Sequence, residues 1–226
     1  MPIVTIGGEK GGTGKSTLAT NLAVEYARKN EGMAVALINS DPQNTAGNWG
    51  ERRKAAAEER AFLVPVYCFS LFGKSIHKEL ADMATRYDMV IVDGAGRDAP
   101  ELRSALLVSD LFVTPLRPSI ADTETVETVE RIVNAAQVYN EKLKATWIMN
   151  HVRQTSRDAR RAEMMDAMGE YPVLVPLCTI ITNLDTYQDA LALGLGVSEM
   201  VKRSVRATTE MAFFYKEVTE WLRAPA

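Results

Sequence analysis

Residues 7–17 read Gly-Gly-Glu-Lys-Gly-Gly-Thr-Gly-Lys-Ser-Thr and nearly match the pattern of a phosphate-binding loop. The usual pattern, G-x-x-x-x-G-K-[ST], fits Gly14, Lys15 and Ser16 but places Glu9 where the first glycine belongs. Lys10 is a second lysine within the same loop. Because one loop cannot easily direct two lysines at the same phosphates, we hypothesise that Lys10 serves the nucleotide of another chain.

The segments on either side of the loop suit phosphate binding. Residues 2–6 form a β-branched apolar run typical of a buried strand, and apolar residues with helical spacing follow from Lys15 to about residue 30. This arrangement directs backbone N–H groups and the positive end of a helix dipole at one anion. We expect Lys15 to reach the β- and γ-phosphates and Ser16 to ligate Mg²⁺. The alternative, a glycine-rich turn that binds nothing, leaves this full strand–loop–helix context unexplained.

The composition is that of a soluble globular protein. The chain has 226 residues, of which 46% are hydrophobic and 24% are charged. It contains no apolar run near the roughly 18 residues that span a bilayer and no secretory leader pattern, so we expect a cytoplasmic protein. The net charge of −3 argues against a general nucleic-acid coat but leaves a local basic patch open.

The cysteines and histidines form no recognisable site. Cys68 and Cys178 are far apart and lie in no C-x-x-C context, which predicts two reduced, buried thiols rather than metal ligands. His77 and His151 are likewise isolated, and we assign neither of them a functional role.

Apolar and amphipathic segments alternate along nearly the whole chain. The predicted strands are 2–7, 33–39, 63–69, 88–93, 111–116, 145–150 and about 173–178. The predicted helices are 15–30, 45–61, 75–86, 100–109, 121–141, 157–168, 185–193 and 200–223. Several strands are nearly continuous apolar runs, which indicates an α/β fold with a doubly wound, mostly parallel sheet covered by helices on both faces. No linker interrupts the pattern, so we expect one domain over residues 1–226, without an N-terminal helix-turn-helix.

Ligands of doubly wound sheets bind at the carboxyl ends of the strands. Asp93 closes one apolar strand, as does the carboxylate that holds Mg²⁺ in phosphate-loop enzymes. Asp41 follows another strand and could orient an attacking water. Phosphoryl transfer chiefly requires positioning and charge neutralisation, which two lysines, Mg²⁺ and such a carboxylate can supply. The alternative is that both aspartates cap the helices that follow them.

Three segments together resemble a known family. They are Lys10-Gly11-Gly12-Thr13-Gly14-Lys15-Ser16-Thr17, Asp41-Pro42-Gln43 and Asp93-Gly94-Ala95-Gly96. The chain resembles the deviant Walker ATPases of the ParA/MinD group, and within it the small ParF-like ParA proteins of plasmid partition. Later markers at residues 115–119 and 187–197 extend the resemblance over essentially the whole chain.

The resemblance implies ATP and Mg²⁺ as cofactors and hydrolysis of ATP to ADP and phosphate. Lys10 would cross a dimer interface to the partner's phosphates, Lys15 would be the phosphate-loop lysine, and Asp41 would be the hydrolytic aspartate. Ser16 and Asp93 would hold Mg²⁺. The remaining contacts to ATP would come from Gly11, Gly12, Thr13, Gly14, Thr17, Asn150 and Pro176, the last two beside the adenine.

The resemblance also implies partners. We expect a homodimer on ATP, non-specific binding to nucleoid DNA, and a centromere-binding protein of ParB-like or ribbon-helix-helix type that stimulates hydrolysis. The candidate DNA contacts are Arg153, Arg157, Arg160, Arg161, Lys202, Arg203 and Arg206. They could equally lie on solvated helix faces. Residues 183–185, Asn-Leu-Asp, carry no basic residue where relatives would have one.

Other functions of the same superfamily fit less well. A MinD-like protein would end in a basic amphipathic membrane helix, but residues 209–223 have balanced charge and core periodicity, so we expect a packed helix and no membrane binding. An iron-protein reductase would need cluster cysteines. We therefore expect segregation of plasmid or chromosome copies; positioning of a protein cargo and a metabolic phosphate-loop ligase remain alternatives.

Overall fold

The computed structural model describes residues 1–119, 122 and 124–225. Seven parallel strands form one sheet in the order β3-β2-β4-β1-β5-β6-β7. The strands are β1 (Ile3–Gly8), β2 (Val35–Asn39), β3 (Tyr67–Ser70), β4 (Met89–Gly96), β5 (Leu111–Leu116), β6 (Lys144–Val152) and β7 (Val175–Thr182). The predicted doubly wound α/β fold is confirmed.

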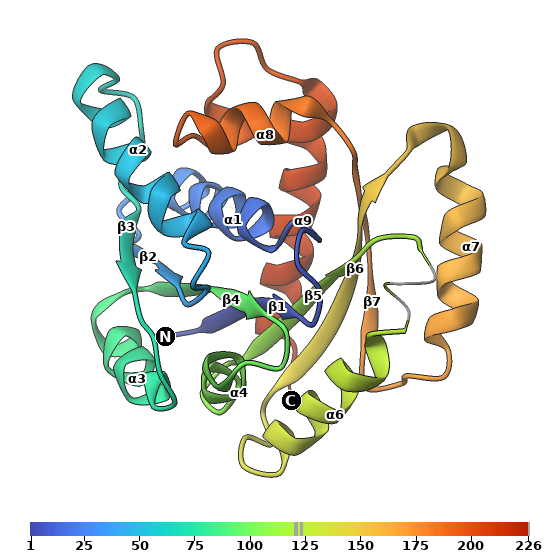
Figure 1. The fold of residues 1–226 in the computed structure, drawn as a ribbon. Helices are drawn as coiled ribbons and strands as arrows, with labels where there is room; N and C mark the ends of the chain where they lie inside the picture. The colour runs from blue at the N-terminus through green and yellow to red at the C-terminus, as the bar shows by residue number, and fades with distance from the viewer. Residues whose placement is uncertain (120–121, 123, 226) are drawn as a thin grey trace.

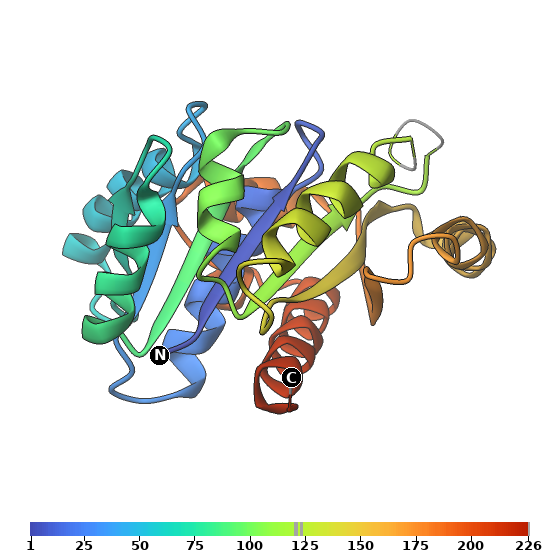
Figure 2. The same ribbon diagram turned by 90° about the horizontal axis from the view of Figure 1, so that it is seen from below.

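Helices cover both faces of this sheet (Figures 1 and 2). One face packs against α1 (Lys15–Lys29), α2 (Thr45–Glu59), α8 (Asp185–Ala192) and α9 (Val205–Arg223). The other packs against α3 (Ile76–Arg86), α4 (Pro100–Leu106), α6 (Val126–Gln137) and α7 (Arg157–Met168). Short 3₁₀ turns, η1 (Gln154–Ser156) and η2 (Val197–Glu199), precede α7 and α9. Neighbouring strand residues such as Val90 and Ile91 enter opposite cores, which explains the continuous apolar runs.

The path of the chain brings three loops together. From β1 it moves outward to β2 and β3, returns to β4 beside β1, and then crosses to β5 on the other side of β1. The segments that follow β1, β4 and β5 therefore leave the same edge of the sheet next to one another. This change of direction is where doubly wound folds bind ligands.

Some boundaries differ from those predicted. The strand expected at 173–178 extends to Thr182, because pairing of Val152 with Thr182 keeps this segment in the sheet. The last helix begins at Val205 rather than residue 200, with Ser204 as its N-cap accepting a hydrogen bond from Ala207 N. The helix expected from residue 121 is described from Val126 onward, and residues 120, 121 and 123 lie outside the described part of the chain.

The C-terminal helix packs into the core as predicted. Met211, Phe214 and Val218 of α9 are buried, and the backbone carbonyls of Trp221 and Ala224 accept hydrogen bonds from Lys144 Nζ. Over the described residues, no helix combines the length and hydrophobicity needed to cross a bilayer.

The prediction of two buried thiols is wrong. Cys178 is exposed because β7 lies at the open edge of the sheet, and Cys68 is only half-buried. Desolvation by its neighbours raises the pKa of the Cys68 thiol to about 11.

Candidate nucleotide site

The loop after β1 depends on glycines at two points. Gly12 and Gly14 have φ angles of +70° and +92°, backbone conformations that residues with a Cβ rarely adopt. Gly14 is the N-cap of α1, and a Cβ there would overlap the side-chain amide of Asn150. Asn150 Nδ2 donates a 2.6 Å hydrogen bond to Thr13 O, so β6 braces the loop from within the sheet.

The two lysines of the loop point in different directions. Lys15 is buried, and its Nζ donates to Lys10 O at 2.8 Å. Lys10 Nζ lies 2.8 Å from Oδ1 of the buried Asp122, although not in hydrogen-bonding geometry, and its side chain is 36% exposed. Desolvation lowers the pKa of Lys15, against the opposing charges of Asp93 and Asp41. Lys15 therefore belongs to the interior of the site and Lys10 to its rim.

Asp93 lies on β4 next to the loop and is completely buried. Neither carboxylate oxygen accepts a hydrogen bond from any described residue. Desolvation raises the pKa of Asp93 to about 7, although the nearby Ser16 hydroxyl and the Lys15 charge act to lower it. The N-cap of α4 is Ala99, so Asp93 does not cap the following helix. An unsatisfied carboxylate beside a hydroxyl is a donor set that suits Mg²⁺.

Asp41 follows β2 and shapes the turn before α2. Its Oδ1 accepts a 2.9 Å hydrogen bond from Gln43 N, whereas the N-cap of α2 is Asn44, in a left-handed conformation with φ +57°. Asn39 Nδ2 holds Asn44 Oδ1 at 2.7 Å and so anchors the turn to the end of β2. The helix-capping alternative is thus excluded for Asp41 as well.

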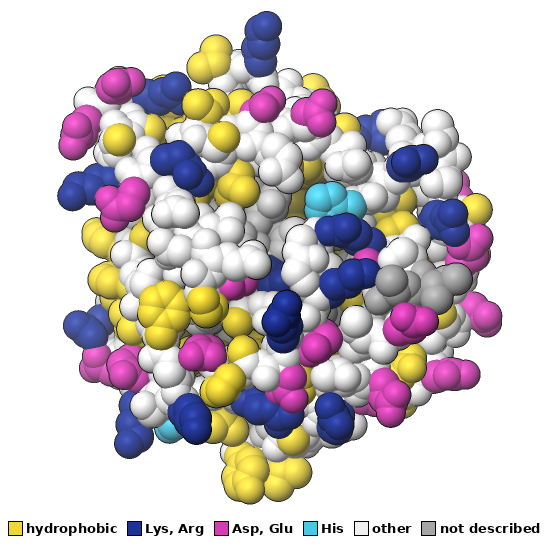
Figure 3. Space-filling model, viewed as in Figure 1, with side chains coloured by type: hydrophobic (Ala, Val, Ile, Leu, Met, Phe, Trp, Pro, Cys, Tyr) yellow, Lys and Arg dark blue, Asp and Glu magenta, His cyan; other side chains and the backbone are white. Residues whose placement is uncertain are grey.

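Several of these residues line one open cavity. Its walls include Lys15, Ser16, Thr17 and Asp41 together with Gly12, Gly14, Gln43, Thr45, His151, Gln188 and Leu191. Figure 3 shows this face of the molecule, with Lys and Arg side chains gathered beside the hollow at its centre. A cationic hollow at a helix N-terminus favours a polyanionic ligand.

Most of the buried polar side-chain atoms that lack a hydrogen bond belong to residues in or shortly after β1, β4 and β5, near the phosphate-binding loop. Among the described residues they include atoms of Glu9, Asp93, Thr114, Arg117 and Asp122. Buried polar groups in native proteins are generally paired, so this concentration indicates a site built for a ligand.

Three residues of the site were missed by sequence reasoning. His151 borders the cavity in a left-handed conformation with φ +56°, and burial together with the Arg117 charge lowers its pKa. It directly follows Asn150 at the end of a predicted strand, a position that could have drawn attention to it. Arg117 lies within the marker segment 115–119, whereas no local pattern distinguishes Asp122.

Two groups of predicted site residues lie away from the cavity. Pro176 pairs with Trp147 near the start of β7, while the loop lies at the carboxyl ends of the strands, so the structure does not bring Pro176 to the expected adenine position. The basic residues occupy two separate places, one from just before η1 into α7 and the other at the start of α9 and in the turn before it (Figure 1). Arg160 is paired with Glu163, and Arg161 donates to Cys178 O.

Comparisons with known proteins identify the family of the chain. The family described as ATPase MipZ matches residues 2–168. Maintenance of carboxysome distribution protein A from Halothiobacillus neapolitanus is 26% identical over 92% of both chains. Protein ParA from Rhizobium radiobacter is 28% identical over 63% of this chain and 61% of its own. An ATP complex of a McdA variant from Cyanothece shares the fold, with a TM-score of 0.73 at 15% identity over 100% of this chain and 98% of that one. This chain belongs to the ATPase MipZ family and is a ParA/MinD-type deviant Walker ATPase.

Proposed function

We propose that this ATPase dimerises around ATP, binds DNA without sequence preference and segregates plasmid or chromosome copies. The observation that carries the proposal is the divergence of the two loop lysines, one buried beside Asp93 and the other half-exposed at the rim. Lys15, the inner lysine, would bind the phosphates of the nucleotide held by its own chain. The outer lysine, Lys10, does not line the cavity of its own chain, and in the proposed dimer it would contact a nucleotide held by a second copy.

The proposed roles within one chain follow from position and burial. Lys15 and the backbone N–H groups of residues 11–17 bind the phosphates, and Asn150 holds the loop in shape. Ser16 and Asp93 would hold Mg²⁺, which neutralises phosphate charge when it is bound. Asp41 borders the same cavity and orients the attacking water.

The DNA and partner steps rest on family and charge. The seven basic candidates, which lie near η1, on α7 and around the start of α9, would contact phosphates. Of these candidates, Lys202 and Arg203 are exposed. A centromere-binding protein of ParB-like or ribbon-helix-helix type would stimulate hydrolysis on the nucleoid. A protein cargo is the second candidate, because the carboxysome-distribution relative aligns with 92% of this chain.

Dimerisation can be tested by light scattering with ATP and Mg²⁺. We expect the wild-type mass to double on ATP addition and Lys10→Ala to remain monomeric while it still binds ATP. Lys15→Ala should lose ATP binding and dimerisation together. Lys29→Ala, in the last turn of α1, is the matched control and should dimerise. A Lys10→Ala protein that doubles in mass would overturn the role across the interface.

Hydrolysis is tested with Asp41→Ala. This variant should dimerise on ATP while its hydrolysis rate falls about 100-fold or more, as for loss of a group that assists proton transfer or water positioning. Phosphate release by the dimeric fraction measures this. Undiminished hydrolysis would exclude the proposed role of Asp41.

DNA binding is tested by a salt titration with ATP present, because phosphate contacts weaken steeply as salt rises. Reversal of charge at Lys202 and Arg203 should reduce both affinity and salt slope, and the same change at Arg160 and Arg161 tests the second group. Stimulation of hydrolysis by DNA with a partner protein supports the proposal. Stimulation by a small metabolite instead would favour a ligase.

A further inference from the structure

We propose that Arg117 binds the terminal phosphate of the nucleotide held by its own loop. This inference rests on the proposed ATP-dependent function and deepens it. It assigns a third cation to the site, in addition to Lys15 and Lys10, and delivers it from β5 rather than from the loop itself.

The first observation is the position of the guanidinium. Arg117 is the first residue after β5, the strand that pairs with β1, and its Nη2 lies 2.8 Å from the point where a Cβ would stand on Gly12. The arginine therefore extends over the half of the loop that lies away from α1. If the phosphates closest to the nucleoside bind at the N-terminus of α1, the terminal phosphate lies over this half of the loop.

The second observation is that the guanidinium is held there without a carboxylate. Among the described residues Arg117 forms no ion pair, and its buried Nε–H donates no hydrogen bond. A buried N–H usually has a hydrogen-bond acceptor, since an unsatisfied buried donor is costly. Arg117 itself is partly exposed, and a planar guanidinium with a free Nε–H beside a phosphate-binding loop matches a phosphate in geometry and in charge.

The third observation is how the arginine is positioned. The backbone N–H of Arg117 donates to Oδ2 of Asp122 at 3.1 Å, while Oδ1 of the same carboxylate lies beside Lys10 Nζ. Asp122 thus positions the main chain of Arg117 by a hydrogen bond, while its negative charge lies next to the ammonium group of Lys10. No acidic side chain among the described residues pairs with the guanidinium itself.

The electrostatics of the free chain agree with this reading. The positive charges of Arg117 and Lys15 lie close enough to interact, and the Arg117 charge adds to burial in lowering the pKa of His151, which lines the cavity. An arginine that served only to hold the fold would gain little from such neighbours. A bound triphosphate would convert this repulsion among cations into attraction.

The test measures nucleotide affinities in a Lys10→Ala background, where the proposed function predicts a monomer. Isothermal titration with ATP, ADP and AMP is compared for Arg117→Gln, Arg117→Lys and Arg28→Gln, the last an exposed arginine on α1 as control. We expect Arg117→Gln to weaken ATP binding about 10- to 30-fold and ADP binding less than about 3-fold, as for loss of a charge-assisted contact to the terminal phosphate. Arg117→Lys keeps the charge but not the fork, so its loss for ATP should be intermediate.

The alternative outcomes are distinguishable. If a folded Arg117 variant lost affinity for ATP and ADP equally, or lost none, the proposed contact with the terminal phosphate would be wrong. If Arg117→Gln does not fold, the affinities of Arg117→Lys provide the test. An ATP effect seen only when Lys10 is intact would overturn the assignment to the chain's own nucleotide. A wild-type protein that binds no ATP would overturn the proposed function, and the contact with it.

Discussion

Two regions of this protein bury charged side chains, and they treat them in opposite ways. At the nucleotide loop, the carboxylate of Asp93 is completely buried and accepts no hydrogen bond from the described residues. Around α8 and α9, the buried carboxylates of Glu199 and Glu210 accept hydrogen bonds at both of their oxygens. The presence or absence of hydrogen-bond donors distinguishes carboxylates that stabilise the fold from a carboxylate at a ligand-binding site.

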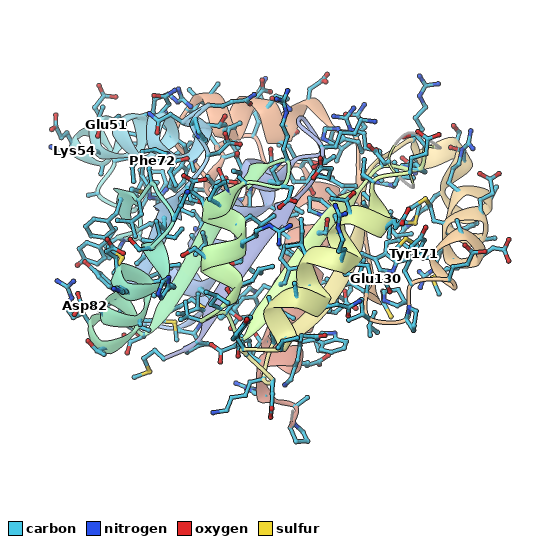
Figure 4. All side chains as sticks on the ribbon, turned by 60° about the horizontal axis from the view of Figure 1, so that its bottom comes forward. Glu51, Lys54, Phe72, Asp82, Glu130 and Tyr171 are labelled. Carbon is cyan, nitrogen blue, oxygen red and sulfur yellow. The ribbon has the colours of Figure 1, made fainter. Side chains whose placement is uncertain are left out.

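The buried carboxylates of Glu199 and Glu210 are bound by residues that are distant in the sequence. Arg53 donates to both carboxylate oxygens of Glu199 at 2.9 Å, and Glu199 Oε2 also accepts from Gly196 N. Glu51 and Lys54 point outward from α2 (Figure 4), whereas Arg53, on the same helix, is buried. This pair attaches α2, which follows the Asp41 turn, to the segment before α9.

Glu210 forms a second engaged cluster. It accepts hydrogen bonds from Thr182 N, from Thr182 Oγ1 at 2.7 Å and from the hydroxyl of Tyr187 at 2.8 Å. Burial and the Glu210 charge raise the pKa of Tyr187, so the phenol stays protonated and donates. The cluster joins α9, β7 and α8.

The largest expected effect on stability is at Arg53. Arg53→Ala leaves the buried Glu199 carboxylate without its cation, and we expect the free energy of unfolding to fall by about 3–5 kcal/mol. Denaturant titration measures the change, with Lys54→Ala, an exposed neighbour on α2, as the matched control. A loss below about 1 kcal/mol would show that the pair does not hold α2 in place.

Substitution of Asp93 should change the free energy of unfolding in the opposite direction and stabilise the free protein. Its folded-state pKa is about 7, above the usual value of 3.8, so between these pH values the folded protein holds a proton that the unfolded chain has lost. Stability should therefore decline as pH rises from about 4 to 7, and Asp93→Asn should remove this decline and stabilise the free protein above pH 7 by roughly 1–4 kcal/mol.

The measurement is thermal and denaturant unfolding of both proteins from pH 5 to 8, without nucleotide. The Asn variant should meanwhile hydrolyse ATP poorly, because it lacks the carboxylate proposed to hold Mg²⁺. A variant less stable than wild type at pH 8 would contradict the view that this site sacrifices stability for function.

Tyr187→Phe should have a smaller effect. It removes one of the hydrogen bonds to Glu210 and leaves both bonds from Thr182, so we expect a loss of about 1 kcal/mol in the free energy of unfolding. The double variant Tyr187→Phe, Thr182→Val tests the cluster further. Strictly additive losses would show that these groups do not act as one network.

Lys10 should have the smallest effect on stability. Its ion pair with Asp122 is part-exposed, so Lys10→Ala should change the free energy of unfolding by less than about 1 kcal/mol, although we expect it to abolish the proposed ATP-dependent dimer. Denaturant unfolding of the nucleotide-free monomer checks this. A large loss would assign Lys10 to the fold rather than to a partner's nucleotide.

Sequence alone determined those features that depend on consecutive residues. The loop at 7–17, the alternation of strands and helices, the acid after β2 and the acid within β4 could be predicted because glycines, apolar runs and strand ends leave local patterns. The strands near the end of the chain were less well bounded, since β7 continues to Thr182 only through its pairing with β6. The exposure of Cys178 likewise depends on β7 being the edge strand.

Tertiary structure decided which distant residues complete the site and the core. Arg53 and Glu199 are separated by 146 positions, and Asn150 braces a loop 137 positions away. Arg117 over Gly12 and Asp122 beside Lys10 depend on β5 crossing to the far side of β1. Such contacts leave no mark in local sequence, because strand order rather than residue spacing brings their members together.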